Sequence, residues 1–182
     1  MHHEHRRSDL TSVHCMADPE TVPEPIFSPE DGLEELWARA YQGEILGELL
    51  FGGIADELED PDQAAAMRTL ATLERRTKEA VAPALERAGV STDIDPETQA
   101  LAAALLAGAL TLSWDELMAT FGPVTAQFIP LYRRIGELSP AEGDTSVLLV
   151  AHEEALRDFS EAEIAGDRAR SLQPIMALAH MR

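Results

Sequence analysis

The sequence predicts an all-α protein folded as an up-down antiparallel bundle. Apolar residues recur every three or four positions through several long segments, and no window shows the sustained period-two alternation of a strand. Ser-Pro or Asp-Pro pairs precede most of these segments, and glycines follow several of them. Connections of only a few residues make long helices turn back on their neighbours, which favours a bundle over a solenoid.

The helix starts are predicted from pairs in which Ser or Asp precedes Pro. The first side chain can accept hydrogen bonds from the free N–H groups of a new helix, and proline has no N–H to lose at the first helical position. Four such pairs are present: Ser28-Pro29, Asp60-Pro61, Asp95-Pro96 and Ser139-Pro140.

The helix ends are predicted from Gly89, Gly122-Pro123 and Gly166, because glycine commonly ends a helix and proline interrupts one. Before the first helix, residues 1–27 lack apolar periodicity and include the acidic, proline-broken PETVPEP, which predicts a disordered N-terminal tail and a helical domain over 28–182. The predicted helices span 29–57, 61–88, 96–120, 123–137, 140–164 and, as a short C-terminal helix, 171–180.

Composition narrows the classes of function. The net charge of −19 repels phosphate backbones and anionic lipid surfaces, so nucleic acid and membranes are not expected partners. The most apolar stretch, 100–112, is shorter than the roughly 20 residues of a membrane span. Cys15 is the only cysteine, which excludes an intramolecular disulfide framework and favours the cytoplasm. Lys78 is the only lysine among many arginines, a bias that suggests a GC-rich bacterial genome.

Two glutamates occupy the apolar stripe of the first predicted helix. Glu44 and Glu48 continue the line of Trp37 and Tyr41, where core residues are expected, and no basic residue lies three or four positions away. An ionised acid left in a core costs on the order of several kcal/mol unless a cation, a proton or hydrogen bonds accompany it. The pair therefore indicates a buried site. Because the helix is apolar on nearly every side here, it is also open that these acids mark its only solvent-exposed edge.

Polar residues also interrupt the stripes of two later helices. Glu74 and Thr77 lie on the stripe of helix 61–88, and His152 lies on the stripe of helix 140–164 beside Glu153. Each has a plainer interpretation: Glu74 could pair with Lys78 four residues on, His152 could bond a backbone carbonyl, and Glu153 could be solvated.

Together these residues predict a metal site within the bundle. Carboxylate oxygens with one imidazole suit iron or manganese, and acids four residues apart on a helix can reach the same cation. The expected ligands are Glu44, Glu48, Glu74 and His152, and Thr77 and Glu153 are expected to orient ligands or water.

On the acids of GEILGE, LERRT and AHEE, residues 29–164 resemble the ferritin-like superfamily of rubrerythrin-like and di-iron carboxylate proteins. The resemblance implies a four-helix core, a metal site between the helices, oxygen or peroxide chemistry at two irons, and a homodimer. Glu44 or Glu48 matches the lone acid of the first helix and Glu74 the acid of the second. Thr77 stands at the position of a histidine, and Leu149 at that of a glutamate, which favours a mononuclear or altered centre.

The expected function is therefore a metal-binding ferritin-like protein that uses oxygen or peroxide on a small-molecule substrate as an oxidoreductase. The alternative is a non-catalytic helical-bundle interaction protein with a degenerate metal site. A third hypothesis is a metal-free enzyme in which a glutamate and a histidine act as general base and acid on a bound ligand.

Overall fold

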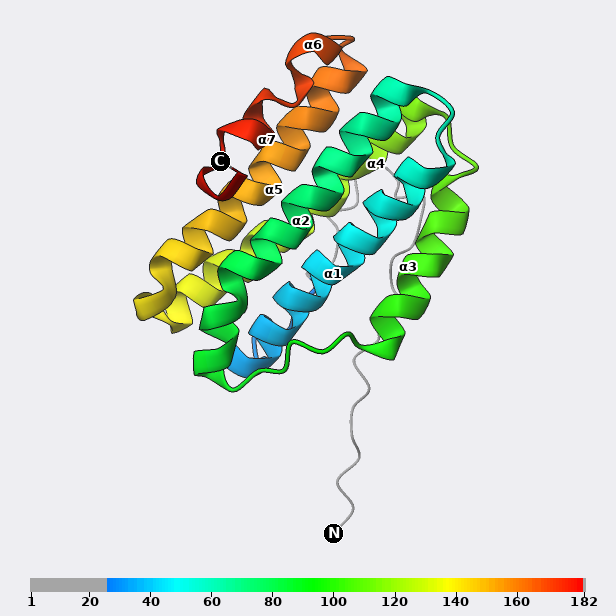
Figure 1. The fold of residues 1–182 in the computed structure, drawn as a ribbon. Coiled ribbons are helices and arrows are strands. Elements are labelled where there is room, and N and C mark those ends of the chain that lie inside the picture. Colours follow the sequence, from blue (N-terminus) through cyan, green and yellow to red (C-terminus); the bar gives the residue numbers. More distant parts are fainter. Residues whose placement is uncertain (1–25, 182) are drawn as a thin grey trace.

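All regular structure in residues 26–181, the part of the chain that the computed structural model describes, is helical (Figure 1). The all-α prediction is therefore confirmed. The predicted tail over 1–27 lies outside the described residues except for Ile26 and Phe27, which pack against the core. The elements are α1 (Leu33–Glu57), α2 (Pro61–Ala88), α3 (Pro96–Ala109), α4 (Trp114–Leu138), η1 (Pro140–Glu142), α5 (Gly143–Ile164), α6 (Arg168–Ser171), α7 (Gln173–Ala177) and η2 (Ala179–Met181).

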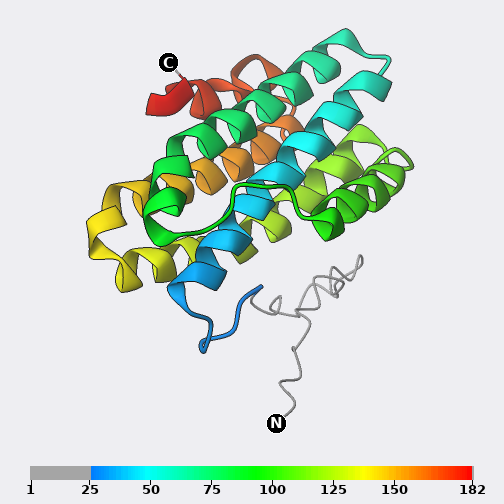
Figure 2. The same cartoon turned by 60° about the horizontal axis from the view of Figure 1, so that its bottom comes forward.

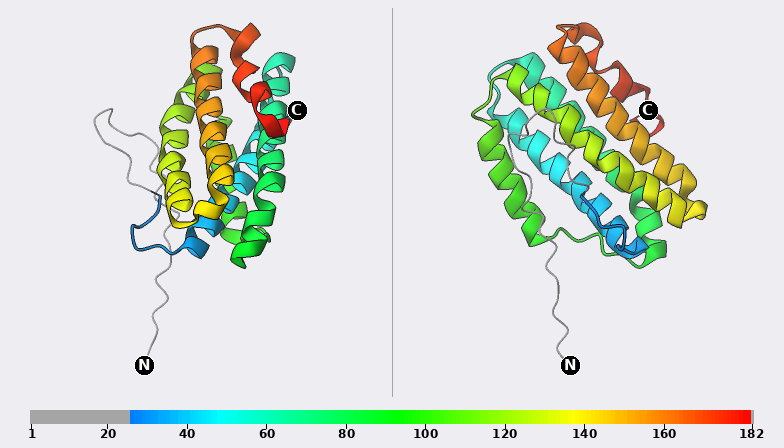
Figure 3. Two further views of the ribbon diagram at one scale, coloured as in Figure 1. Left: turned by 90° about the vertical axis from the view of Figure 1, so that its left-hand side faces the viewer. Right: turned by 180° about the vertical axis from the view of Figure 1, so that it is seen from behind.

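The helices form two closely packed pairs, α1 with α2 and α4 with α5. The first pair contacts the second through α1 on α4 and α2 on α5, and Figure 3 shows the two pairs side by side. Helix α3 lies outside these pairs and packs against α1 (Figure 2). The C-terminal elements turn back along α5, so that η2 reaches α2. None of the helices in the described residues combines the length and apolarity needed to cross a membrane.

The core consists of two apolar clusters at different levels of the long helices. On α2, Leu73 belongs to the first cluster and Val81 to the second; on α5, Ala155 belongs to the first and Leu149 to the second. The buried residues between these levels are polar on both helices. The first cluster includes Phe51, Met67, Leu70, Phe121 and Phe159, and the second includes Trp37, Tyr41, Leu85, Leu131, Tyr132 and Ile135.

Two of the four predicted helix caps form as expected. The Asp60 carboxylate accepts from the N–H groups of Asp62 and Gln63, and that of Asp95 accepts from Glu97. Ser28 instead lies in a turn before α1, which begins at Leu33 rather than at 29. At Ser139-Pro140 the chain first forms the 3-10 turn η1, so α5 begins at Gly143.

The predicted boundary between helices 96–120 and 123–137 is wrong. Helix α3 ends at Ala109, and α4 continues through Gly122-Pro123 to Leu138. The start of α4 is a capping box, in which Ser113 and Glu116 satisfy each other's backbone N–H groups. Proline removes only one N–H from the helix, and burial of residues on both sides of the Gly-Pro pair, including Met118 and Leu131, holds α4 together.

The predicted C-terminal helix over 171–180 is divided into shorter elements. Helix α6 ends at Ser171, and α7 begins at Gln173 with Pro174 in its first turn. Proline favours such a start because it cannot donate to a preceding helical turn.

The capping box makes the start of α4 sensitive to one hydroxyl. We expect Ser113→Ala to lower the free energy of unfolding by about 1 kcal/mol, the usual loss for an N-terminal cap. Ser139→Ala is the matched control, because the Ser139 side chain makes no cap hydrogen bond. Urea denaturation of both variants measures the difference, and equal stability of the two would contradict this account of the helix start.

Candidate functional site

Four ionisable side chains from three helices meet between the two apolar clusters. Glu44 comes from α1, Glu74 from α2, and His152 and Glu153 from α5. Their exposed fractions are 1% for Glu44, 3% for Glu74, 1% for His152 and 5% for Glu153, so all four are removed from bulk water. We call these four residues the buried acid cluster.

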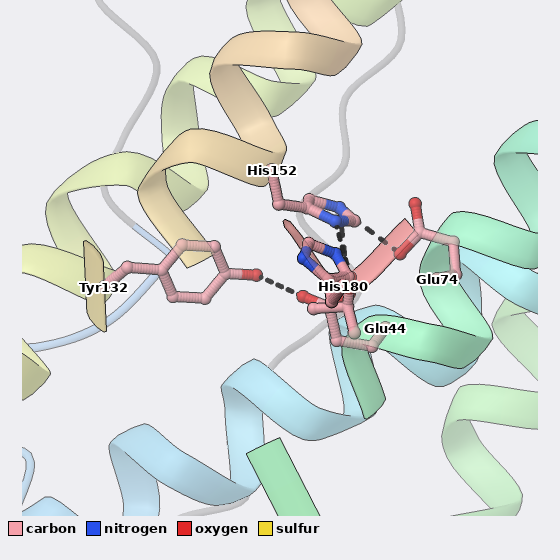
Figure 4. Close-up of polar contacts among 6 residues, drawn as sticks. Glu44, Glu74, Tyr132, His152 and His180 are labelled. Atoms are coloured by element: carbon pink, nitrogen blue, oxygen red, sulfur yellow. Dashed lines mark hydrogen bonds and ion pairs between the residues drawn. The ribbon is translucent and has the colours of Figure 1, made fainter. Parts of the chain in front are cut away.

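The imidazole of His152 lies beside the carboxyl groups of Glu74 and Glu44 (Figure 4). Its Nε2 atom is 3.4 Å from Oε2 of Glu74 and 3.7 Å from Oε2 of Glu44. Glu44, His152 and Glu153 each offer one ligand atom, and these atoms lie within 4.8 Å of one another. This group of three could hold a metal ion.

Glu48, the fourth predicted ligand, does not join the cluster. It forms an ion pair with Lys78 of α2, and its side chain is 29% exposed. Spacing along α1 reveals only basic neighbours on that helix, whereas the cation that pairs with Glu48 comes from the adjacent helix. The alternative ion pair of Glu74 with Lys78 does not form, since Glu74 is buried and Lys78 binds Glu48. The charge of Lys78 still acts on Glu74 and opposes the rise in its pKa. The solvent-exposed edge of α1 is therefore at Glu48, and Glu44 faces the interior.

The two residues expected to orient ligands lie at the site. The Thr77 hydroxyl oxygen is 2.9 Å from Nδ1 of His152, on the side of the ring away from the carboxyl groups. Glu153 belongs to the group of three that could hold an ion, which places it as a candidate ligand in its own right.

Sequence reasoning missed Tyr132 and His180. The buried Tyr132 hydroxyl on α4 donates to Oε1 of Glu44 at 3.0 Å. The half-buried His180 on η2 places its Nε2 atom 3.1 Å from the Thr77 hydroxyl oxygen. Tyr132 sits in an apolar stripe with Leu131 and Ile135, where a tyrosine usually indicates packing, and no local pattern around His180 points to a site.

Because Gly47 has no side chain, there is space beside it for the Glu74 carboxyl group. A Cβ atom at position 47 would lie 2.6 Å from the carboxyl carbon of Glu74 and 2.9 Å from each of its oxygens, closer than real contacts allow. Glycine on α1 therefore lets the acid of α2 lie directly against the α1 backbone.

Burial controls the protonation of these groups. It raises the pKa of Glu44 and Glu153 well above the usual range and raises the pKa of Glu74 to about 8. Burial also lowers the pKa of His152, which favours the neutral imidazole, and the negative charge of Glu44 opposes that effect. Without an ion, burial therefore favours the protonated form of these acids, and a pKa of about 8 keeps Glu74 mostly protonated at neutral pH.

Among the described residues, no side-chain cation is ion-paired with this cluster. Within residues 26–181, no lysine or arginine forms an ion pair with Glu44, Glu74 or Glu153. The Oε2 atom of Glu44 is buried and has no hydrogen-bond partner among the described atoms. An unsatisfied buried acceptor costs roughly 1–3 kcal/mol, more when charged, so the position suits a proton or a cation.

The surface hollow of about 540 Å³ between α1 and α2 does not open onto the cluster. It is lined by Glu48 and Arg75 among others, but by none of the four cluster residues. The arrangement thus favours a small guest such as an ion over an organic molecule.

Comparison of the chain with protein-family models, with curated proteins and with solved structures finds no match. The ferritin-like resemblance therefore stays a prediction from the sequence.

The neutral acids predict how stability depends on pH in chelator-treated protein. Glu74 has an ordinary pKa of about 4.3 when unfolded and about 8 when folded, so its contribution to stability is complete below about 4.3 and is lost as pH rises to about 8. Glu74→Gln should therefore reduce the fall in unfolding free energy across this window by up to about 1.4 kcal/mol per pH unit. Urea denaturation at a series of pH values measures the slope, and an unchanged slope in the variant would contradict the assignment.

Proposed function

We propose that this chain is a metal-binding protein that holds one iron or manganese ion through Glu44, His152 and Glu153, with Glu74 beside them. The observation that carries the proposal is a buried set of three acids and one imidazole to which no lysine or arginine of the described residues is ion-paired.

A divalent cation suits this set better than protons alone. A proton can be shared by at most two acids, such as Glu44 and Glu74, whereas one cation can contact several carboxylates and the imidazole together. Oε2 of Glu44, which has no hydrogen-bond partner among the described atoms, can take part in such a contact. Carboxylate oxygen with imidazole nitrogen is a donor set typical of iron and manganese. Binding must displace the protons that burial keeps on the acids, so the apparent affinity should rise with pH.

We also propose that the four long helices α1, α2, α4 and α5 form an antiparallel four-helix bundle of ferritin-like type with a mononuclear centre. The two helix pairs support this arrangement, as do the ligands from α1 and α5 with Glu74 of α2 beside them. Thr77 and Leu149 stand where a second metal would need a histidine and a glutamate, which supports one ion rather than two.

We further propose that the protein is an oxidoreductase of the cytoplasm and that the bound ion takes part in its reaction. Because the hollow between α1 and α2 does not reach the cluster, we limit the reactants at the site to molecules as small as oxygen or peroxide. The Tyr132 hydroxyl, hydrogen-bonded to Glu44, would hold that ligand in one orientation and keep a proton close to it.

The two glutamates of α1 allow a matched test of metal binding. Wild type and Glu48→Gln should bind one Mn²⁺ or Fe²⁺ per chain, and Glu44→Gln should bind more weakly by over about 100-fold, since even outer partners of ligands are worth roughly 10- to 100-fold. Anaerobic calorimetric titration measures the affinity and the number of ions bound per chain, and metal analysis after desalting checks that number.

The outcome separates the cluster from the surface. Loss of binding in Glu48→Gln but not in Glu44→Gln would place the ion outside the cluster, and the absence of binding in wild type would refute the proposal. Circular dichroism of each variant confirms that the helices are retained.

A second candidate function, self-association as an interaction module, is favoured by helix α3. This helix is apolar, yet only Thr98 and Ala102 are buried, and Ala100, Ala104 and Ala107 face solvent. No charged residue occurs from Thr98 to Ser113 in a chain of net charge −19. Two copies of this acidic protein repel each other, and the repulsion is weakest where the contacting surfaces carry no charge. The apolar face of α3 is such a surface, so a second copy of the chain is the best-suited partner.

A single charge on α3 tests the homodimer. We expect wild type to be dimeric by light scattering after size-exclusion chromatography, and Ala104→Glu to be monomeric, because two copies of the new carboxylate would meet at the interface. Ala65→Glu, at an exposed alanine of α2, is the control and should stay dimeric. A monomeric wild type, or dimers of both variants, would refute an α3 interface.

A further inference from the structure

A chain of three polar groups leads from the buried acid cluster to the C-terminal end of the protein. Nδ1 of His152 is 2.9 Å from the Thr77 hydroxyl oxygen, which is 3.1 Å from Nε2 of His180 (Figure 4). The Arg76 guanidinium donates to the backbone carbonyl of His180 at 3.3 Å and so holds η2 against α2. The inner ring is buried and the outer ring is half-buried.

The hydroxyl at the centre of this chain can donate only one hydrogen bond. Among the described residues the two imidazoles are the only hydrogen-bond partners of this hydroxyl, so Thr77 donates to one ring and accepts from the other when both rings are neutral. An imidazole that binds an ion through Nε2 is neutral, and burial lowers the pKa of His180, which favours its neutral form. The chain thus has two orientations, inward with Thr77 donating to His152, and outward with Thr77 donating to His180.

An ion in the cluster would select one of these orientations. The cluster acids Glu44 and Glu74 face Nε2 of His152, so Nε2 is the nitrogen that an ion among them would contact. The proton of His152 must then lie on Nδ1 and be donated to Thr77. Thr77 in turn must donate to Nε2 of His180, which leaves the proton of His180 on its own Nδ1.

We propose that His180 is a positioning residue of the metal site, and that occupancy of the site fixes His180 as the Nδ1–H tautomer. This inference rests on the proposed metal-binding function. It adds to the site a residue on the C-terminal segment that does not touch the ion and acts through Thr77 on the orientation of His152.

The reversal of the chain conserves protons. In the inward orientation the ring protons are on Nε2 of both histidines. When an ion enters, the proton on Nε2 of His152 is released to bulk water and the Thr77 proton passes to Nδ1 of His152. The proton on Nε2 of His180 passes to Thr77, and water supplies one proton to Nδ1 of His180. The three groups carry the same number of protons before and after.

Nuclear magnetic resonance of the ring nitrogens tests the proposal directly. The chain has six histidines, and replacing His2, His3, His5 and His14 by Gln leaves only His152 and His180 to report. Zn²⁺ serves as the diamagnetic probe, and ¹⁵N–¹H long-range correlation distinguishes the two tautomers of each ring. With Zn²⁺ we expect a metal-bound Nε2 on His152 and the Nδ1–H tautomer on His180, which is the less common form of histidine in water.

The result distinguishes this inference from the proposed function. If Zn²⁺ leaves the His152 signals unchanged, the metal-binding function fails. If Zn²⁺ binds Nε2 of His152 while His180 stays in the Nε2–H form or shows both forms, the metal site stands and the relay is refuted.

Two variants separate a positioning role from simple packing. Thr77→Val keeps the shape of the side chain but has no hydroxyl, so Zn²⁺ should no longer change the His180 tautomer. His180→Gln keeps an acceptor for Thr77 and should retain Zn²⁺ affinity, whereas His180→Leu removes the acceptor and should weaken it by up to roughly 10-fold, the lower end for an outer partner. Equal Zn²⁺ affinities of the Gln and Leu variants would contradict the positioning role. This comparison does not depend on whether Thr77→Val folds.

Discussion

The structure depends on keeping the acids of the buried cluster from being ionised without a partner. Glu44, Glu74 and Glu153 lie between two apolar clusters and form no ion pair with a lysine or arginine of the described residues. Each uncompensated charge there costs several kcal/mol, whereas a whole domain is stable by only about 5–15 kcal/mol. The fold can therefore exist with protons on these acids, or with a cation among them, but not with three bare carboxylates.

This constraint joins folding to binding. The side chains that an ion would contact are brought together only when α1, α2 and α5 pack, so any affinity for the ion adds to the stability of the packed state. The supporting contacts have the same origin: Gly47 lets α2 approach α1, and the Tyr132 hydroxyl from α4 holds Glu44. All four long helices thus contribute to one polar level of the core.

The sequence predicted the inward-facing members of this level because helical periodicity is a local property. Glu44, Glu74 and His152 each interrupt an apolar stripe, and that is enough to identify them. Glu48 interrupts the same stripe as Glu44, and its different fate depends on Lys78 from the neighbouring helix, which no pattern within α1 reveals.

Tyr132 and His180 were missed for a related reason. Their partners Glu44 and Thr77 lie 88 and 103 residues away in the chain, so only the folded structure relates them. The boundary between α3 and α4 was misplaced because a Gly-Pro pair resembles a helix end, whereas the capping box at Ser113 and burial on both sides of the pair determined the outcome.

The position of Glu74 against Gly47 has a consequence for how the helices align. If α2 slid one turn along α1, the Glu74 carboxyl group would leave the backbone of Gly47. In one direction it would meet the side chains of Leu50 and Phe51, and in the other it would meet Gly43, where the ring of Phe128 already fills the space. Apolar residues tolerate such a shift, because one leucine can replace another, but a buried acid that fits at one place does not. The polar level therefore acts as an alignment mark that selects a single pairing of helices whose other faces are rich in interchangeable Ala and Leu.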